Sequence, residues 1–204
     1  MRTLLFIIAV ACVGCAATKS PERWVENNTL YSTKLPAIEV KVSTSLSYNK
    51  TKAEGSIAES DKGNSHSGLD TEWFYFSDST NKAQLSIDIE TLNTHTDWYM
   101  EPPDYSKSSS LMSDHEKIGD INFATGILRK NISGVPLLIK AYGAVAGETT
   151  RYSLLYMEIV DNNWLDKHSA LLTSSERDFL SEFNKRADAS FSISPYSGKP
   201  SPTQ

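Results

Sequence analysis

Apolar and polar residues alternate strictly along two stretches of this chain, and this alternation constrains the fold more than any other feature. In residues 38–48, every second position is Ile, Val, Val, Thr, Leu or Tyr. In residues 84–92, Leu85, Ile87 and Ile89 alternate with Ser, Asp and Glu. Successive side chains of a strand point to opposite faces of its sheet, so this period of two predicts half-buried β-strands.

Further stretches predict the partners of these strands. Residues 71–76 are rich in aromatic side chains, and the polar turn at 77–81 would join them to 84–92 as an antiparallel hairpin. Residues 118–128, 135–145 and 151–160 predict three more strands, connected as a meander.

One amphipathic helix is predicted over residues 174–189. Thr173 and Glu176 have the spacing of a capping box, in which a hydroxyl and a carboxylate satisfy the first free NH groups of a helix. Apolar side chains then recur at helical spacing, namely Phe179, Leu180, Phe183, Ala187 and Phe191. The expected fold is α+β: a single antiparallel sheet of about five to seven strands with a C-terminal amphipathic helix packed on one face. The alternative is a β-sandwich with a terminal helix.

The remaining stretches set the expected limits of this single α+β domain at residues 37–194. Residues 49–70 and 93–115 are rich in turn-forming residues and predict two long loops. Residues 195–204 contain three prolines and few apolar side chains, which predicts a disordered tail.

Residues 15–36 predict a polar tether that precedes the domain. Its second half contains apolar side chains that we expect to dock onto the domain: Trp24, Val25, Leu30 and Tyr31.

The start of the chain has the order of a secretory signal peptide. Arg2 is followed by an apolar run from Leu4 to Val13, and then by Gly14 and Cys15. The run is about half as long as a helix that crosses a bilayer, so it is typical of a signal core rather than of a membrane span. We therefore expect a signal peptide over residues 1–14.

Gly14 and Cys15 resemble the cleavage site of bacterial lipoprotein signal peptides. In that family a small residue precedes the cysteine that receives diacylglycerol and becomes the new N-terminus. The resemblance implies that Cys15 is lipidated and anchors the protein to a membrane of the cell envelope. Ala16 is not the aspartate that retains such proteins at the inner membrane, which favours the outer membrane of a Gram-negative bacterium. Cleavage before Cys12 and an ordinary cut after Ala17 remain open.

The charge of the chain disfavours some classes of partner. The formal net charge is −5, and the sequence contains no block of Lys or Arg that would bind phosphates, so nucleic acid is not an expected partner. Both cysteines lie in the first fifteen residues, so the domain has neither a disulfide nor a catalytic cysteine. No phosphate loop or dinucleotide-binding turn is present, and we expect no cofactor.

Candidate catalytic or metal-binding groups are weak. His95 and Asp97 could meet residues 114–116 if the loop folded back, but a solvated polar loop explains these residues better, so no metal site is predicted. Ser47 and Lys50 have the spacing of penicillin-recognising enzymes, without the companion motifs of that class. We predict no catalytic residues; whether the chain is an enzyme stays open, and a non-catalytic role is favoured.

The best candidate for a partner contact lies in residues 98–105, where Trp98, Tyr99, Met100 and Tyr105 flank two prolines. Aromatic side chains and Met are enriched at interfaces. The alternative is that Trp98 and Tyr99 cap the core beneath a long loop. The favoured function is a membrane-tethered envelope lipoprotein that binds an envelope protein or a small ligand. The alternatives are an envelope hydrolase with a site in loops 49–70 and 93–115, and a purely structural accessory lipoprotein.

Overall fold

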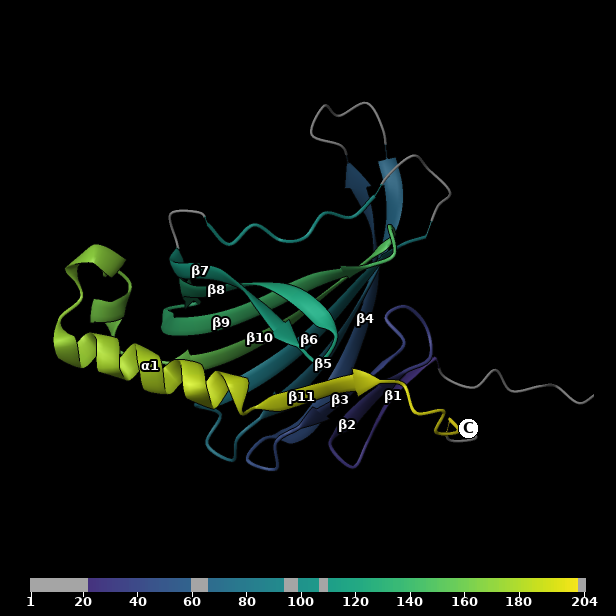
Figure 1. The fold of residues 1–204 in the computed structure, drawn as a ribbon, viewed down its shortest axis with the longest axis horizontal. Helices are drawn as coiled ribbons and strands as arrows, with labels where there is room; N and C mark the ends of the chain where they lie inside the picture. Colours follow the sequence, from purple (N-terminus) through teal and green to yellow (C-terminus); the bar gives the residue numbers. More distant parts are fainter. Residues whose placement is uncertain (1–21, 60–65, 94–98, 107–109, 202–204) are drawn as a thin grey trace, which may run out of the picture.

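The computed structural model describes residues 22–59, 66–93, 99–106 and 110–201, which form two antiparallel sheets and one α-helix (Figure 1). The strands are β1 (Arg23–Glu26), β2 (Thr29–Ser32), β3 (Ile38–Val42), β4 (Ser47–Glu59), β5 (His66–Ser77), β6 (Ala83–Leu92), β7 (Ser110–Ile118), β8 (Ile121–Ile132), β9 (Val135–Ala146), β10 (Thr150–Ile159) and β11 (Phe191–Pro195). The helices are the short 3-10 turns η1 (Asn162–Trp164) and η2 (Ser169–Leu171) and the α-helix α1 (Ser174–Asp188).

The large sheet has seven strands in the order β4-β5-β6-β10-β9-β8-β7. Its alternating strands match the prediction: β6, β9 and β10 lie within a residue or so of the expected bounds, and β8, β9 and β10 form the predicted meander. We call the face that carries Phe74, Ile87, Tyr142 and Leu154 the inner face, and the opposite face the outer face. These four side chains are fully buried, because the rest of the domain packs against them.

The small sheet has four strands in the order β1-β2-β3-β11. Its first hairpin turns at Asn27 and Asn28, whose φ angles of 49° and 60° suit the tight turn that joins two antiparallel strands. Apolar side chains of this sheet, such as Val40, share one core with the inner face and with Phe183 of α1. The small sheet and α1 therefore cover the inner face together (Figure 1).

The prediction of a mostly antiparallel fold with a C-terminal helix is confirmed, and the prediction of a single sheet is wrong. The alternating run 38–48 was expected to be one strand, but it contributes to both sheets. The chain leaves β3 at Val42, turns with a Leu46 NH to Ser43 oxygen hydrogen bond of 3.0 Å, and enters the large sheet at Ser47. Asn28 stabilises this turn, because its amide nitrogen donates to the Ser43 oxygen at 3.2 Å.

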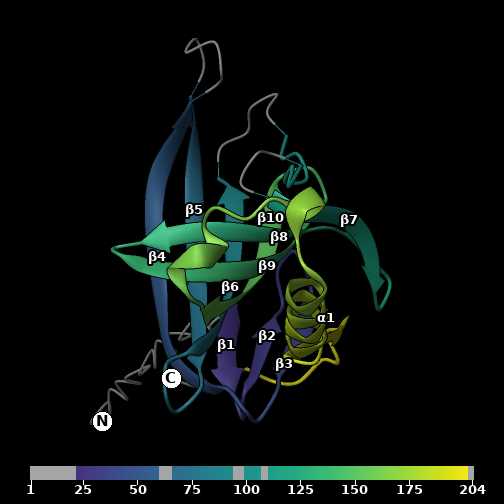
Figure 2. The same cartoon turned by 90° about the vertical axis from the view of Figure 1, so that its left-hand side faces the viewer.

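The expected loop at residues 49–70 is also wrong, because most of it belongs to strands. Residues 47–59 and 66–77 form the long β4–β5 hairpin, which extends beyond the other strands (Figure 2). Every residue from Thr51 to Ile57 is exposed. Because this part of the hairpin has no buried face, its sequence lacks the alternation that would identify a strand.

The second expected loop, residues 93–115, ends earlier than predicted. Residues 110–118 form β7, and Gly119, with a φ of 60°, lies in the tight turn that leads into β8. The predicted strand 118–128 is therefore shifted, since Ile118 ends β7 and β8 runs from Ile121 to Ile132.

Both ends of the described chain pack onto the small sheet. Trp24 stacks on Tyr31 with ring centroids 5.2 Å apart, so the part of the expected tether after residue 22 is folded. The expected disordered tail also differs from the structure over its described part. Pro195 pairs with Ile38, and the Lys199 ammonium lies 2.9 Å from the Glu26 carboxylate.

Within the part of the chain that the structure describes, no helix is long and apolar enough to span a bilayer.

Candidate functional site

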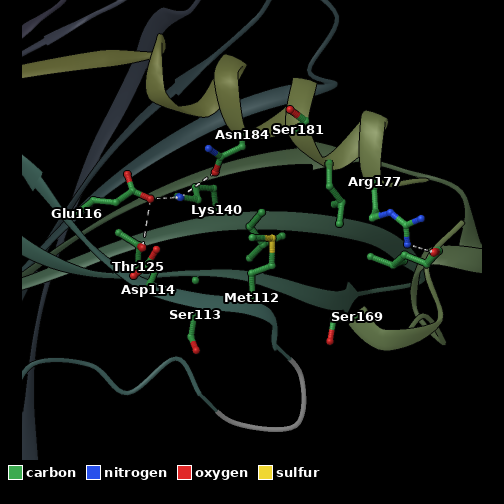
Figure 3. A pocket seen from close by; sticks show the side chains of 14 residues that line it. Met112, Ser113, Asp114, Glu116, Thr125, Lys140, Ser169, Arg177, Ser181 and Asn184 are labelled. Carbon is green, nitrogen blue, oxygen red and sulfur yellow. Dashed lines mark hydrogen bonds and ion pairs between the residues drawn. The ribbon is translucent and has the colours of Figure 1, made fainter. Parts of the chain in front are cut away.

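A pocket of about 510 Å³ lies between α1 and the inner face of β7, β8 and β9 (Figure 3). It is lined by Met112, Ser113, Asp114, Glu116, Thr125, Gly126, Ile127, Lys140, Ser169, Leu172, Arg177, Leu180, Ser181 and Asn184. We call it the inner pocket. Its volume lies within the range of small-molecule sites in proteins.

Strand register brings the polar residues of the inner pocket together. Thr125 of β8 pairs with Asp114 of β7, and Lys140 of β9 pairs with Ile127 of β8. Lys140 has the same parity in β9 as the buried Leu138 and Tyr142, so its side chain points to the inner face. Lys140 is only 4% exposed, which is unusual for a lysine and requires a partner.

Two acceptors hold the Lys140 ammonium. It forms an ion pair with the Glu116 carboxylate, and it donates a hydrogen bond of 2.8 Å to the Asn184 side-chain oxygen of α1. The Thr125 hydroxyl donates to the same Glu116 oxygen at 3.3 Å. Figure 3 shows these four side chains gathered at one end of the inner pocket.

The polar network continues under the helix. The Asn184 amide nitrogen donates to the Asp188 carboxylate at 3.1 Å, and the Tyr142 hydroxyl donates to the other oxygen of Asp188 at 2.6 Å. Burial, followed by the hydrogen bond to Asp188, raises the pKa of Tyr142 well above its ordinary value. Tyr142 therefore stays protonated and remains a donor, so the network fixes the position of α1 on the sheet.

The middle and the far end of the inner pocket are different in character. Met112, Ile127, Leu172 and Leu180 give the inner pocket an apolar lining, and Met112, which is 56% exposed, lies near its middle (Figure 3). At the far end the Arg177 guanidinium donates to the Leu172 carbonyl oxygen. The inner pocket thus has an apolar body between two polar ends.

The start of α1, which forms one wall of the inner pocket, is fixed by the predicted capping box. The Thr173 hydroxyl accepts from the Glu176 NH at 3.3 Å, and the Glu176 carboxylate accepts from the Thr173 NH at 2.8 Å. The Lys167 ammonium and these Thr173 bonds lower the pKa of Glu176 to about 2. The carboxylate is therefore charged at neutral pH, as the positive end of the helix dipole favours.

Of the predicted contact residues, Tyr99, Met100 and Tyr105 lie in a segment that crosses the outer face, residues 99–106, which we call the strap. Cys15 and Trp98 lie outside the described residues. Tyr99 is 65% exposed, whereas the Met100 NH donates to the Glu148 oxygen at 2.7 Å. Tyr99 is therefore open to a partner.

Tyr105 is half-buried against the outer face, where two glycines make room for the strap. A Cβ atom on Gly126 would lie 2.6 Å from the Tyr105 Cβ, and one on Gly143 would lie 2.3 Å from Pro103 Cγ. Tyr105 also shares a hydrogen bond with Ser153, and burial raises its pKa. Tyr105 and Pro103 therefore cover part of the outer face of the large sheet.

The candidate metal ligands are not brought together where the structure describes them. His95 and Asp97 lie outside the described residues. Along β7, Asp114 and Glu116 point to the inner face and His115 has the opposite parity. No group of three His, Cys, Asp or Glu side chains that could hold a metal occurs within residues 22–59, 66–93, 99–106 and 110–201.

Sequence reasoning missed Lys140, the central residue of the inner pocket. Its signal was present, because Lys140 occupies a buried parity position between Leu138 and Tyr142 in a strand that was correctly predicted. Glu116 and Asn184 are 24 and 44 residues away in the chain, so no local pattern connects them to Lys140.

Comparison of the chain with protein-family models, with curated proteins and with solved structures gave no match.

Proposed function

We propose that this protein is a lipid-anchored lipoprotein of the bacterial cell envelope whose domain binds a small amphipathic molecule in the inner pocket. The leader sequence with Gly14 and Cys15 supports the anchor and the location, with the outer membrane favoured. The inner pocket supports a binding role, since an apolar cavity with a few convergent polar groups is the usual form of a small-molecule site.

The observation that carries the proposal is the arrangement around Lys140. The ammonium is already paired with Glu116 and bonded to Asn184, so it is held in place rather than left to act as a nucleophile. A ligand would place a polar group against these fixed side chains and its apolar part against Met112 and Leu180. The arrangement therefore favours recognition over catalysis.

Binding can be tested with the fluorescent probe 1-anilinonaphthalene-8-sulfonate, which combines an apolar body with an anionic group. The full chain in lipid nanodiscs is titrated, and the signal of empty nanodiscs is subtracted. We expect saturable fluorescence that Met112→Trp weakens at least tenfold, because indole fills the apolar middle of the inner pocket. Ile57→Trp, on the remote β4–β5 hairpin, is the matched control and should bind as the wild type does. Equal binding by Met112→Trp and wild type would contradict the proposed site.

The anchor is tested separately by expressing the wild type and Cys15→Ala in a Gram-negative bacterium. The wild type should partition into the detergent phase and carry the mass of its acyl groups, and Cys15→Ala should lose both properties. Cys12→Ala is the control and should keep them. Identical mass and partitioning of the wild type and Cys15→Ala would rule out lipidation at Cys15.

The exposed Tyr99 supports a protein partner as a second, compatible role. A photo-crosslinking amino acid at position 99 in the tethered protein should capture one envelope protein reproducibly. The same amino acid at position 57, also exposed, serves as the control. Capture of the same proteins from both positions would remove the support for a specific contact at Tyr99.

A further inference from the structure

A second hollow, of about 460 Å³, lies on the outer face of the large sheet, away from the inner pocket. We call it the outer groove. It is lined by Trp73, Tyr75, Lys82, Gln84, Ser86, Asp88, Ile132, Val135, Leu137, Leu155, Met157 and Ile159. Three of its apolar residues, Ile132, Val135 and Ile159, are each 39–47% exposed. Exposed aliphatic side chains gathered in one place are a mark of a binding surface.

The outer groove contains a carboxylate in an apolar setting. Asp88 of β6 lies between Trp73 of β5 and Ser153 of β10 in the strand register. The Ser86 hydroxyl donates a hydrogen bond to it. Burial, with a contribution from the negative charge of Glu90, raises the pKa of Asp88 to about 6, against the lowering effect of the Ser86 bond. Asp88 is thus ionised at neutral pH at an energetic cost.

The cations around Asp88 are engaged elsewhere. Arg151 of β10 pairs with Glu90 at 2.6 Å, and Lys52 of β4 pairs with Glu54 at 2.7 Å. Lys82 lines the same groove, but it precedes the start of β6 and is six residues from Asp88, a separation of about 20 Å along extended chain. Within the described residues, no ammonium or guanidinium group forms an ion pair with Asp88.

The neighbouring strand β5 adds two aromatic rings, and a lysine of β4 lies beside each of them. Trp73 is in register with Asp88, and Tyr75 is in register with Ser86. The Lys52 ammonium lies 4.9 Å from the centre of the Trp73 ring, and the Lys50 ammonium lies 5.5 Å from the centre of the Tyr75 ring. Tyr75 and Tyr105 are the remaining titratable groups near Asp88, and burial raises the pKa of both, so both stay protonated. Aromatic rings and a carboxylate together are the groups with which proteins bind organic cations.

We infer that the outer groove binds a small amphipathic cation, a primary amine on an aromatic or aliphatic body. The ammonium group pairs with the Asp88 carboxylate beside Trp73. The apolar body lies along Leu155 and Met157, between the aromatic rings and the exposed aliphatic rim. This site is distinct from the inner pocket, because the two lie on opposite faces of the sheet.

The test uses a charged probe and its neutral analogue. Fluorine NMR follows the binding of 2-(4-fluorophenyl)ethylammonium and of 2-(4-fluorophenyl)ethanol to the full chain in nanodiscs at pH 7.5. We expect the ammonium probe to bind at least tenfold more tightly than the alcohol. Asp88→Asn should remove this preference, whereas Asp120→Asn, an exposed carboxylate in the β7–β8 turn, should keep it. Far-UV circular dichroism establishes that both variants are folded.

A second variant tests the position of the apolar body. Leu155→Trp should weaken the binding of both probes, because indole occupies the floor of the outer groove. Lowering the pH from 7.5 to 5 should weaken only the ammonium probe, since Asp88 takes up a proton. Asp88→Asn and Leu155→Trp should both leave the binding of the fluorescent probe in the inner pocket unchanged. A failure of the outer-groove proposal is therefore distinguishable from a failure of the inner-pocket proposal. Equal affinity of the two probes for the wild type, no binding, or unchanged preference in Asp88→Asn would overturn the inference.

Discussion

The two faces of the large sheet differ in how their buried charged side chains are paired. On the inner face, Lys140 is buried beneath α1 and is paired with Glu116 and Asn184. On the outer face, Asp88 is largely buried, receives a hydrogen bond from Ser86, and has no paired cation among the described residues. A buried charge that has its partner within the protein contributes to a defined structure, and a charge that lacks one is more costly to maintain.

The difference follows from what covers each face. The helix brings its own polar side chains, Asn184 and Asp188, to the inner face, so the charges there are satisfied when α1 docks. The strap covers only part of the outer face, where Gly126 and Gly143 receive it. The remaining part contains the outer groove, where the Asp88 carboxylate is available to the proposed organic cation.

The largest expected effect tests the inner face. Lys140→Met removes the cation and leaves Glu116 with its charge uncompensated, so we expect the free energy of unfolding to fall by about 3 kcal/mol. Urea unfolding followed by circular dichroism measures the change. Adding Glu116→Gln to the same chain should recover part of the loss.

The matched control is Lys117→Met, the next residue along β7 after Glu116. Its ammonium is exposed and lies 3.8 Å from the Asp120 carboxylate, so its removal should change stability by less than about 0.5 kcal/mol. If Lys140→Met and Lys117→Met lower the free energy of unfolding equally, the buried pair contributes no more stability than the exposed one.

The next effect concerns the covered part of the outer face. Gly143→Ala places a methyl group 2.3 Å from Pro103 Cγ, so either the strap or the strand must shift, at a cost of about 2 kcal/mol. Hydrogen exchange of the Met100 amide should become faster, since the strap holds its bond to Glu148. Gly55→Ala is the control, because its new methyl group meets its nearest atom at 3.4 Å. Unchanged exchange at Met100 in Gly143→Ala would show that this contact does not hold the strap.

A smaller effect, of opposite sign, is expected for the outer groove. The pKa of Asp88 is raised in the folded chain to about 6, so the folded state holds its proton more tightly than the unfolded chain does. The stabilisation from the protonated form is therefore complete below about pH 4 and is lost as the pH rises through 6. Asp88→Asn should be more stable than the wild type at pH 7 by about 1.5 kcal/mol and should lack this pH dependence.

Thermal unfolding from pH 4 to pH 8 measures this difference. Asp120→Asn serves as the control and should follow the wild type across the range, because its carboxylate is exposed. If the stability of the wild type and that of Asp88→Asn change by the same amount between pH 4 and pH 8, the assigned role of Asp88 is contradicted.

The smallest effect returns to the inner face, at the start of the helix that covers it. Thr173→Ala removes the hydroxyl of the capping box and should cost about 1 kcal/mol in urea unfolding. Ser174→Ala, one residue later, keeps the box and should be nearly neutral. If both variants lose the same stability, the cap does not fix α1.

The sequence predicted those elements whose two sides meet different surroundings. Strand β6 was identified because Leu85, Ile87 and Ile89 are buried while the residues between them face the other way. The helix was identified because Thr173 and Glu176 act on each other locally. Both signals are contained in a few consecutive residues.

The rest depends on contacts between distant residues. The break between β3 and β4 has no Gly or Pro, and it is stabilised by the Asn28 side chain, 15 residues before Ser43. The inner pocket depends on Glu116, Lys140 and Asn184, which meet only after β7, β9 and α1 have packed. The anchor at Cys15 stays a prediction, because it lies outside the described residues.

The C-terminal segment returns to the first strand, and this determines where a tag or a reporter can be attached. Tyr196 lies against Trp24 with ring centroids 6.3 Å apart, and Lys199 pairs with Glu26, so the last described residues end beside the point where the fold begins. The described chain therefore enters and leaves the fold on the same side, which under the proposed anchor at Cys15 is the side nearest the membrane. Under the same proposal, a reporter inserted after Glu59, at the end of β4 that extends beyond the other strands, would stand clear of the bilayer (Figure 2).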